Sequence, residues 1–267
     1  MDPVAQLIDR LNGTNKLRVW SVIITFFGDA IVPRGGSVSA RTVQNLLQRM
    51  GIEAGAVRTA FSRLTTDGWV VRDKLGRSSF YHLSPTGLRP FAEATDRIYA
   101  PLPVPDLTNG LWSLSFRQED FPKPHLTRKG ADNNRQPIVA GDAFHLSGNI
   151  QHIPDWMKDM SCPKDHRQSY EALIAAFEPI MGVDVAGIDA QVVRCLLIHE
   201  WRRILFQFDK VEPEFWTQDW PEAQCHRFVS TLYQQVLPAS EAWMDAEATG
   251  PEGPLPPPAS DLTSRFT

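Results

Sequence analysis

Two short amphipathic segments, separated by a tight connection at Gly51, constrain the fold of this chain most strongly. Both show the i, i+3, i+4 spacing of a helix with one buried face. The two stripes are Val43, Leu46, Leu47 and Met50, then Val57, Ala60, Phe61 and Leu64. Ser39 is the predicted N-cap of the first helix, and Gly51 lies where a helix C-cap is expected. Two helices joined by so short a turn predict a helix-turn-helix.

The residues on either side support this interpretation. A largely buried helix is predicted over residues 15–30, ended by the PRGG run at 33–36. After the second amphipathic helix, residues 68–72 and 79–83 alternate like strands, residues 73–78 are predicted as their turn, and residues 84–87 as an exit turn. A helix pair followed by a β-hairpin is typical of a winged helix-turn-helix, whose second helix enters the DNA major groove.

The outward residues of these elements suit DNA. Arg58 can reach guanine O6 and N7, and Thr59 or Ser62 can contact base edges or phosphates. Lys74 and Arg77 lie near the hairpin tip, where phosphate or the minor groove is in reach. The predicted DNA contacts are Arg41, Gly55, Arg58, Thr59, Ser62, Arg63, Lys74, Arg77 and Ser78. The alternatives are intradomain pairs for Arg63 and Arg72 and, for the whole module, a protein–protein adaptor.

The charge distribution points the same way. The formal net charge is −4, but residues 1–90 hold twelve Lys/Arg against six Asp/Glu, whereas residues 91–267 hold fifteen against twenty-five. A basic block joined to an acidic remainder predicts that the first part meets a polyanion while the second does something else. Chance unevenness of charge on solvated faces is the alternative.

Composition excludes several classes of protein. With 267 residues, 42% hydrophobic and 22% charged, the chain is long enough to bury a core and is neither disordered nor fibrous. Three widely spaced cysteines argue against a disulfide framework, so we expect a cytoplasmic protein. The longest apolar stretch falls short of the roughly 20 residues that span a bilayer, and the N-terminus lacks the apolar core of a signal peptide.

The remainder of the chain predicts a mixed middle part and a helical end. Pro101, Pro103 and Pro105 form a stiff segment after a helix near residues 89–100. Strands are predicted at residues 111–116 and 142–146 with a mobile polar loop at 123–137 between them, and helices at 166–178 and 189–208. A last helix is expected to start with Asp219 as its N-cap and Glu222 three residues on. Residues 250–258, with five prolines, predict a disordered tail.

One helix carries the candidate ligand-binding residues. An apolar stripe on residues 189–208 faces a core, and the opposite edge gathers His199, Arg202 and Arg203. Guanidinium groups suit the phosphates of a CoA-like anion. Glu200, Asp209 and other acids of this region can pair with the same arginines, so structural ion pairs are the alternative.

The sequence shows few patterns that are typical of catalytic sites. His125, His145, His152, His166 and Cys162 lack the spacing of a metal site. The chain has no P-loop, no G-x-S-x-G and no H-E-x-x-H motif. We therefore expect no catalytic residues, no metal site, no cofactor and no enzymatic activity.

A combination of short runs resembles a known family. The N-terminal runs are FGDA at 27–30, PRGG at 33–36, VRTA at 57–60, RL at 63–64 and GW at 68–69. The downstream runs are LIHEWRR at 197–203, DWP at 219–221 and LPASE at 237–241. Together they resemble the PaaX family, bacterial repressors of phenylacetic acid degradation genes.

The resemblance implies an α+β protein with an N-terminal winged helix-turn-helix, a middle ferredoxin-like α/β domain similar to a CRISPR spacer-acquisition subunit, and a C-terminal helical domain. The corresponding boundaries are 1–90, a linker at 91–106, a middle and dimerisation domain at 107–180, the helical domain at 181–248 and a Pro-rich tail at 249–267. It also implies a homodimer that binds an operator in double-stranded DNA and is released by an aryl-CoA such as phenylacetyl-CoA.

A metal-dependent nuclease of the CRISPR-like fold is the alternative function. Nuclease chemistry would need an acidic residue at the end of the first middle strand, where this chain has Arg117 before Glu119 and Asp120. Metal-dependent cleavage of DNA would distinguish the nuclease from the repressor.

Overall fold

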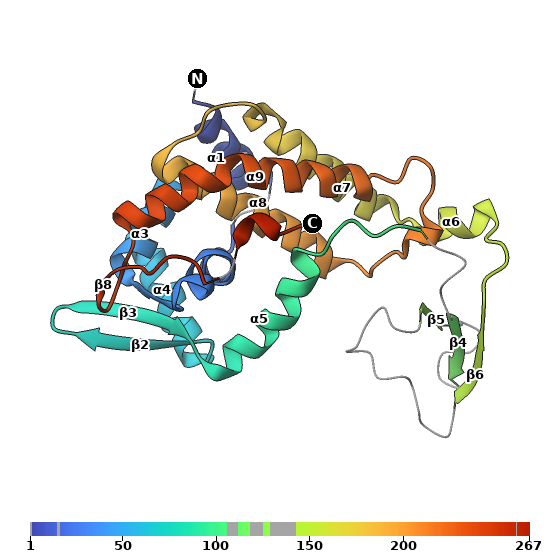
Figure 1. Cartoon of the computed structure of the whole chain (residues 1–267), viewed down its shortest axis with the longest axis horizontal. Coiled ribbons are helices and arrows are strands. Elements are labelled where there is room, and N and C mark those ends of the chain that lie inside the picture. Colours follow the sequence, from blue (N-terminus) through green and yellow to red (C-terminus); the bar gives the residue numbers. More distant parts are fainter. Residues whose placement is uncertain (1, 15–16, 106–111, 118–124, 129–142, 260) are drawn as a thin grey trace. The chain divides into compact units, whose positions relative to one another are not determined.

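A computed structural model of the chain describes residues 2–14, 17–105, 112–117, 125–128, 143–259 and 261–267 (Figure 1). It is an α+β protein with many helices and small antiparallel sheets. The chain divides into two compact units. Unit 1 contains Met1–Leu102, Asp165–Asp209 and Pro221–Thr267, and unit 2 contains Pro103–Lys164 and Lys210–Trp220. The boundaries expected from the sequence stay predictions; the compact units group the chain differently, because the C-terminal helices pack on the N-terminal ones.

Unit 1 is built around a central helix, α8 (Gly187–Gln207). The helices α2 (Val19–Phe26), α3 (Ala40–Arg49), α5 (Pro85–Ile98) and α9 (Glu222–Glu247) all contact it. Its residues from Ala190 to Trp201 are buried on every side, charged ones included. The remaining helices are α1 (Pro3–Thr14), α4 (Ala54–Thr66), α7 (Lys164–Phe177), and the 3-10 turns η4 (Glu178–Ile180) and η6 (Leu262–Ser264).

The helix predicted over residues 15–30 is present from Val19 in a modified form, and residues 15–16 of the prediction lie outside the description. Helix α2 passes at Phe26 into a π-helical turn, η1 (Phe27–Ile31), and then into a 3-10 turn, η2 (Val32–Arg34). Gly35 ends the run with a left-handed φ of 84°. π-turns inside helices reorient the side chains that follow, and the reoriented segment here contains Asp29.

Backbone and side-chain caps fix the ends of α3 and α4. Ser39 accepts from the amide of Thr42 (3.1 Å), which confirms the predicted N-cap. Helix α3 ends in a Schellman motif, in which the amide of Ile52 bonds the carbonyl of Leu47 (3.0 Å) and Gly51 has φ 80°. Helix α4 ends in the same way at Gly68. The directions in which the chain leaves both helices are therefore set by the backbone.

A three-stranded antiparallel sheet follows, in the order β1-β3-β2. Its strands are β1 (Ser37–Ser39), β2 (Val70–Leu75) and β3 (Ser78–Leu83). The β2–β3 pairing continues to Leu75 opposite Ser78, so the predicted turn at 73–78 shortens to Gly76 and Arg77. The hairpin is consequently longer than expected and presents a narrow tip.

Two predicted helix starts are wrong. Residues 84–87 are the beginning of α5, with Ser84 as an N-cap that accepts from the amide of Gly87 (2.9 Å), and not an exit turn. A Cβ at Gly87 would lie 2.6 Å from the carbonyl oxygen of Trp69, which explains a glycine in the first turn. Helix α9 starts after Pro221, and Asp219 is not its cap.

The predicted disorder of the C-terminal tail is also wrong for the residues described. The tail forms a small hairpin, β7 (Thr249–Gly250) and β8 (Gly253–Pro254), and then packs on unit 1. Leu255, Leu262 and Phe266 are buried. The prolines suit an extended segment that is held by side-chain contacts.

Unit 2 contains a second antiparallel sheet in the order β5-β4-β6. Its strands are β4 (Trp112–Arg117), β5 (His125–Arg128) and β6 (Ala143–Gly148), accompanied by α6 (Asp155–Ser161) and η5 (Pro213–Phe215). The strands at 111–116 and 142–146 are confirmed to within a residue or two. β5 lies within the predicted mobile loop at 123–137, whose other residues, 123–124 and 129–137, are outside the description. The ferredoxin-like arrangement stays a prediction.

Candidate nucleic-acid interface

Helix α4 is anchored by the apolar stripe identified in the sequence. Val57, Ala60, Phe61 and Leu64 are all buried. The Phe61 ring stacks on Tyr81 of β3 with centroids 3.8 Å apart, so the helix is fixed against the hairpin. The opposite face of α4 is left to solvent.

All nine predicted DNA contacts lie on the surface. Arg41 of α3, five residues of α4 and three residues at the hairpin tip are exposed, whereas their neighbours on the apolar stripes are buried. The outer face of α4 forms a shallow depression. It is lined by Arg58, Thr59, Ser62, Arg63, Thr66 and Asp67. We call the exposed face of α3, α4 and the β2–β3 hairpin the α4–hairpin surface.

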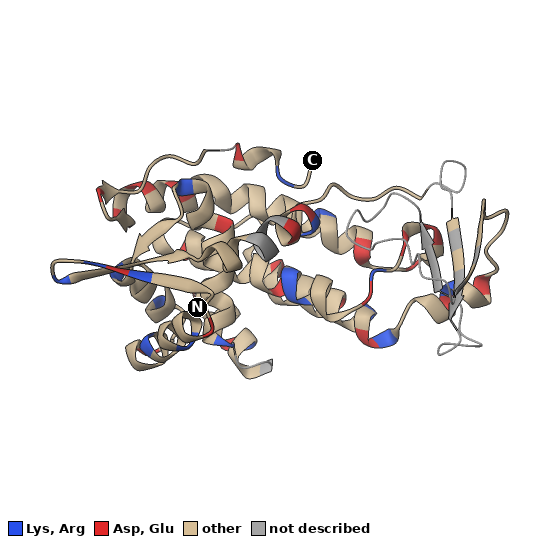
Figure 2. Ribbon diagram, turned by 90° about the horizontal axis from the view of Figure 1, so that it is seen from below, with Lys and Arg blue, Asp and Glu red and all other residues tan. Residues whose placement is uncertain are grey.

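Within the described part of the chain, four cations of this surface have no acidic partner. Among the residues that the structure describes, Arg41, Arg58, Lys74 and Arg77 form no ion pair. Figure 2 shows the β2–β3 hairpin with more blue (Lys and Arg) than red (Asp and Glu) along it. An exposed cation without a partner keeps its charge available to an incoming phosphate.

Three other polar side chains of this surface have local partners. Arg63 lies 3.5 Å from Asp67, one helical turn away, which is the intradomain pair considered for it. Arg72 donates to Ser79 Oγ across the hairpin (2.7 Å). The Thr59 hydroxyl donates to the Gly55 carbonyl (3.0 Å), so it can still accept but not donate elsewhere.

The predicted ligand-binding edge of α8 has a different environment from the one expected. His199 is 5% exposed and faces α2, where Thr25 Oγ1 lies 3.2 Å from its Nδ1. Burial, followed by the charges of Arg202 and Arg203, lowers the pKa of His199 to about 3. The expectation that His199 lies on an outward-facing edge of α8 is wrong. Other helices pack around α8 and cover it at this residue.

The two arginines differ in their partners. Arg203 forms an ion pair with Glu200 (2.8 Å) and bonds Gln207, as the structural alternative expected. Arg202 donates only to Ser21, at 2.7 Å to its hydroxyl. Among the described residues, its Nε has no hydrogen-bond partner and no carboxylate pairs with it. Burial lowers the pKa of Arg202.

These contacts belong to a polar seam between α2 and α8. Ser21, Thr25 and Asp29 follow each other at i, i+4 and i+8, and they meet Arg202, His199 and Arg194 in turn. The two segments therefore run antiparallel with a polar pair at each turn. Polar pairs buried between helices fix their register, because a slip leaves the polar groups unpaired.

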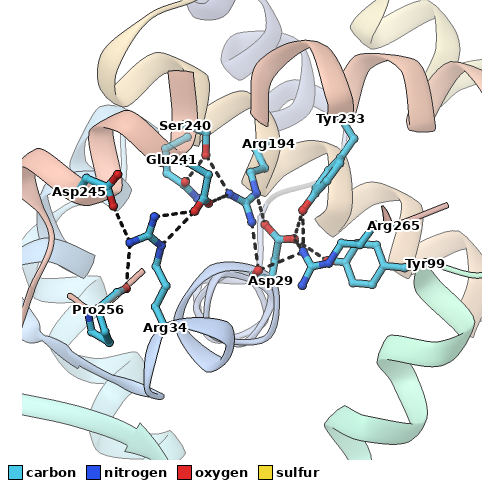
Figure 3. Close-up of polar contacts among 11 residues, drawn as sticks. Asp29, Arg34, Tyr99, Arg194, Tyr233, Ser240, Glu241, Asp245, Pro256 and Arg265 are labelled. Carbon is cyan, nitrogen blue, oxygen red and sulfur yellow. Dashed lines mark hydrogen bonds and ion pairs between the residues drawn. The ribbon is translucent and has the colours of Figure 1, made fainter. Parts of the chain in front are cut away.

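The last pair of the seam is the centre of a buried ionic network that the sequence did not reveal (Figure 3). Asp29 is 2% exposed and accepts from Arg265 (2.6 Å), Tyr99 (2.5 Å) and Tyr233 (3.2 Å), while Arg194 Nε lies 2.6 Å from its Oδ2. Burial alone would raise the pKa of Asp29, but the charges of Arg194 and Arg265 outweigh it and the pKa is lowered.

The network continues through α9. Arg194 also pairs with Glu241, and the second carboxylate oxygen of Glu241 accepts from Arg34 at 2.6 Å. Arg34, 1% exposed, pairs further with Asp245 (2.7 Å), whose side chain is 63% exposed at the edge of the network. Three arginines are thus matched by three acids, and their contributors are α8, α9, the η1–η2 turns and the tail (Figure 3). Matching of this kind is what makes buried charges tolerable.

The structure also gives the surroundings of several other residues singled out in the sequence. His166 is buried and stacks between Tyr170 and Phe208. Cys162, Cys195 and Cys225 are buried, and no disulfide joins them. Within the described residues, no group of three or more His, Cys, Asp or Glu side chains is placed to hold a metal ion, and no helix is both long and apolar enough to cross a membrane. β4 ends at Arg117, and Glu119 and Asp120 lie outside the described residues.

Comparison with known proteins finds two family matches. Residues 18–87 match the model of the PaaX-like protein family, and residues 163–246 match the model of the PaaX-like protein C-terminal domain. The chain is also similar to the transcriptional repressor PaaX of Escherichia coli K12, with 27% identity over 92% of this chain and 89% of that protein. A solved structure, uncharacterized protein Rv0674 of Mycobacterium tuberculosis, aligns with a TM-score of 0.46 and 15% identity over 77% of this chain and 91% of its own.

Proposed function

Since this chain belongs to the PaaX family of transcriptional repressors, we propose that it is a non-enzymatic, sequence-specific DNA-binding repressor of phenylacetate-type catabolic genes. Helices α3 and α4 with the β2–β3 hairpin form its winged helix-turn-helix. In this assignment α4 enters the major groove and the hairpin is the wing.

The observation that carries the DNA-binding proposal is the set of unpaired cations on the α4–hairpin surface. Arg58 extends from the outer face of α4, where a guanidinium can bond O6 and N7 of guanine. Lys74 and Arg77 flank the narrow hairpin tip, at which phosphates or the minor groove are in reach. These residues contribute nothing to internal ion pairs among the described residues, so their charges support contact with a polyanion outside the molecule.

The effector and the oligomeric state belong to the same proposal. A homodimer in the cytoplasm binds the operator and leaves it when an aryl-CoA such as phenylacetyl-CoA binds. The family resemblance supports this ligand. Of the three candidate residues, Arg202 adds local support, because its guanidinium lacks an acidic partner in the described part of the chain and keeps Nε free to donate. Arg203 and His199 would first have to exchange their present partners.

Fluorescence anisotropy tests the DNA-binding proposal. The labelled duplexes are the promoter fragment of the gene that encodes the protein and a random sequence of equal length, each titrated at several salt concentrations. We expect a preference for the promoter at physiological salt, and an affinity that falls as salt rises because bound phosphates release counterions. Equal binding of both duplexes at physiological salt would contradict the proposal.

Titration of phenylacetyl-CoA into the protein–DNA complex tests the effector. We expect the ligand to release the DNA, whereas CoA alone and phenylacetate alone, the two controls, do not. Arg202→Gln should weaken release, and Arg227→Gln, an exposed α9 arginine, should not. Failure of every aryl-CoA to release the DNA would contradict the ligand assignment while leaving DNA binding intact.

A further inference from the structure

The C-terminal segment follows the connection that leads into the helix-turn-helix. We call residues 249–267, apart from the undescribed residue 260, the C-terminal strap; it lies beyond residue 246, where the family match ends. It runs antiparallel to residues 29–42. The contacts join Thr249 to Ser39 and Thr42, Pro256 to Arg34, Ala259 to Pro33, and Arg265 to Asp29. The strap thus holds the whole path from the end of α2 to the start of α3.

The first contact is with the N-cap of α3. The Thr249 hydroxyl donates to Ser39 Oγ (2.9 Å), and the Thr249 amide donates to Thr42 Oγ1 (3.2 Å). Ser39 Oγ also accepts from the amide of Thr42 to cap α3. Figure 1 shows the small β7–β8 hairpin beside the hairpin of the sheet, and β7 contacts β1 directly. The strap therefore bonds to the group that defines where α3 begins.

The middle of the strap is bonded to the turn between α2 and α3. Arg34 Nη1 donates to the Pro256 carbonyl (3.0 Å), and the Ala259 amide donates to the Pro33 carbonyl (2.7 Å). Two backbone groups of the strap are satisfied here by the turn that reverses the chain.

The far end is fixed by charge and by aromatic packing. Arg265 donates to both the carboxylate and the carbonyl of Asp29, and its guanidinium lies 4.0 Å from the centre of the Tyr99 ring. The Phe266 amide donates to the Tyr99 carbonyl (3.0 Å). The strap therefore also holds the residue that caps the end of α5.

We propose that the C-terminal strap positions the DNA-reading helices, with Thr249 as the positioning residue at α3. The inference rests on the proposed function. Helix α3 is held at its other end by Arg49, which pairs with Asp189 of α8 (2.6 Å). One end of α3 is thus bonded to the strap and the other to α8. In this position α3 sets the direction of α4 through the Schellman turn at Gly51. Operator recognition then depends on the strap, although the strap contributes no residue to the α4–hairpin surface.

The test is operator preference in full-length Thr249 variants. Thr249→Val removes the donor to Ser39 at nearly constant volume, and we expect about a tenfold loss of operator affinity, the usual effect of one hydrogen bond. Affinity for the random duplex should stay unchanged, because nonspecific contacts do not require one orientation. Thr249→Ser restores the hydroxyl and should restore the preference. Hydrogen exchange at residues 37–42 should quicken in the Val variant only.

A matched control separates positioning from stability. Gln235→Leu removes hydrogen bonds from α9 to residues 180–183, away from the strap, and should lower the free energy of unfolding without changing operator preference. If Thr249→Val retains the wild-type ratio of operator to random affinity, the strap is only structural and the inference is overturned. If the wild-type protein itself shows no operator preference, the proposed function fails instead.

Discussion

Arginines in two regions of this molecule have opposite environments. Arg41, Arg58 and Arg77 of the α4–hairpin surface are exposed and have no acidic partner among the described residues. Arg34 and Arg194 of the buried network are at most 1% exposed, and each pairs with two carboxylates. The comparison teaches that arginine content alone does not mark an interface.

The two groups also differ in what their loss should change. A buried charge is stable only while its partners remain, so the network should control folding. An exposed cation contributes little to folding, so its loss should appear in DNA binding. Substitutions in each region therefore test whether folding and DNA binding are served by different charged residues.

The largest effect is expected for Asp29→Asn. The substitution leaves the buried Arg194 and the partly buried Arg265 beside a neutral side chain, and breaking a buried ion pair costs about 3–5 kcal/mol. Urea unfolding followed by tryptophan fluorescence measures the loss. Asp67→Asn, which removes an exposed pair with Arg63, is the control and should cost less than about 1 kcal/mol. Equal losses of unfolding free energy in the two variants would show that the buried and the exposed ion pairs contribute equally to folding.

The next effect is a pH dependence from His199. Its pKa is about 3 in the folded protein and 6.5 as a free group, so between these values the unfolded chain binds a proton that the folded chain does not. Stability is therefore complete above pH 6.5 and falls as the pH falls, by about 2 kcal/mol at pH 5. His199→Gln should show a shallower fall in urea titrations at several pH values, whereas the exposed His152→Gln should follow the wild type. An unchanged slope in His199→Gln would mean that His199 is not held neutral.

Arg58→Ala should lower operator affinity by about 1–3 kcal/mol and relax the choice of base at one position. The reason is the loss of a bidentate contact to guanine, with no internal partner left unsatisfied. Anisotropy with single-base operator variants measures both effects. Arg227→Ala on α9 removes the same charge outside the α4–hairpin surface and should change neither. A loss of folding stability in Arg58→Ala would show that Arg58 has a structural role.

The smallest effect is expected for Lys74→Ala. A phosphate contact at the hairpin tip carries no sequence information, so operator and random duplex should weaken alike. The slope of log affinity against log salt should fall by about one. Arg203→Ala, which removes a cation already paired with Glu200, should leave this slope unchanged. A change in sequence preference would assign Lys74 to base contact.

The parts that the sequence predicted depend on local signals. The stripes of α3 and α4 lie within single helices, and Ser39 and Gly51 act on amides and carbonyls a few residues away. Exposure of Arg58 or Lys74 follows directly from their position opposite a stripe or near a turn. Such features need no knowledge of distant residues.

The buried network and the strap depend on distant residues and were missed. Asp29 meets Arg194 and Arg265, which are 165 and 236 positions away. The i, i+4, i+8 series of Ser21, Thr25 and Asp29 in an otherwise apolar helix was a signal of a polar partner helix, although it could not identify α8. His199 was placed on an outer edge because a single helix does not reveal how many neighbours surround it.

The α2–α8 seam has a consequence for how such a chain can evolve. Residues 1–90 contain every predicted DNA contact, yet α2 within them depends on α8 for Ser21, Thr25 and Asp29. A gene fragment that ended at residue 90 would encode every predicted DNA contact. It would lack α8, so the polar residues Ser21, Thr25 and Asp29 would lose their partners. Recombination could therefore not exchange residues 1–90 for the corresponding segment of another protein as an independent module. A functional transfer to a new protein would have to bring α8, α9 and the last nineteen residues of the chain with it.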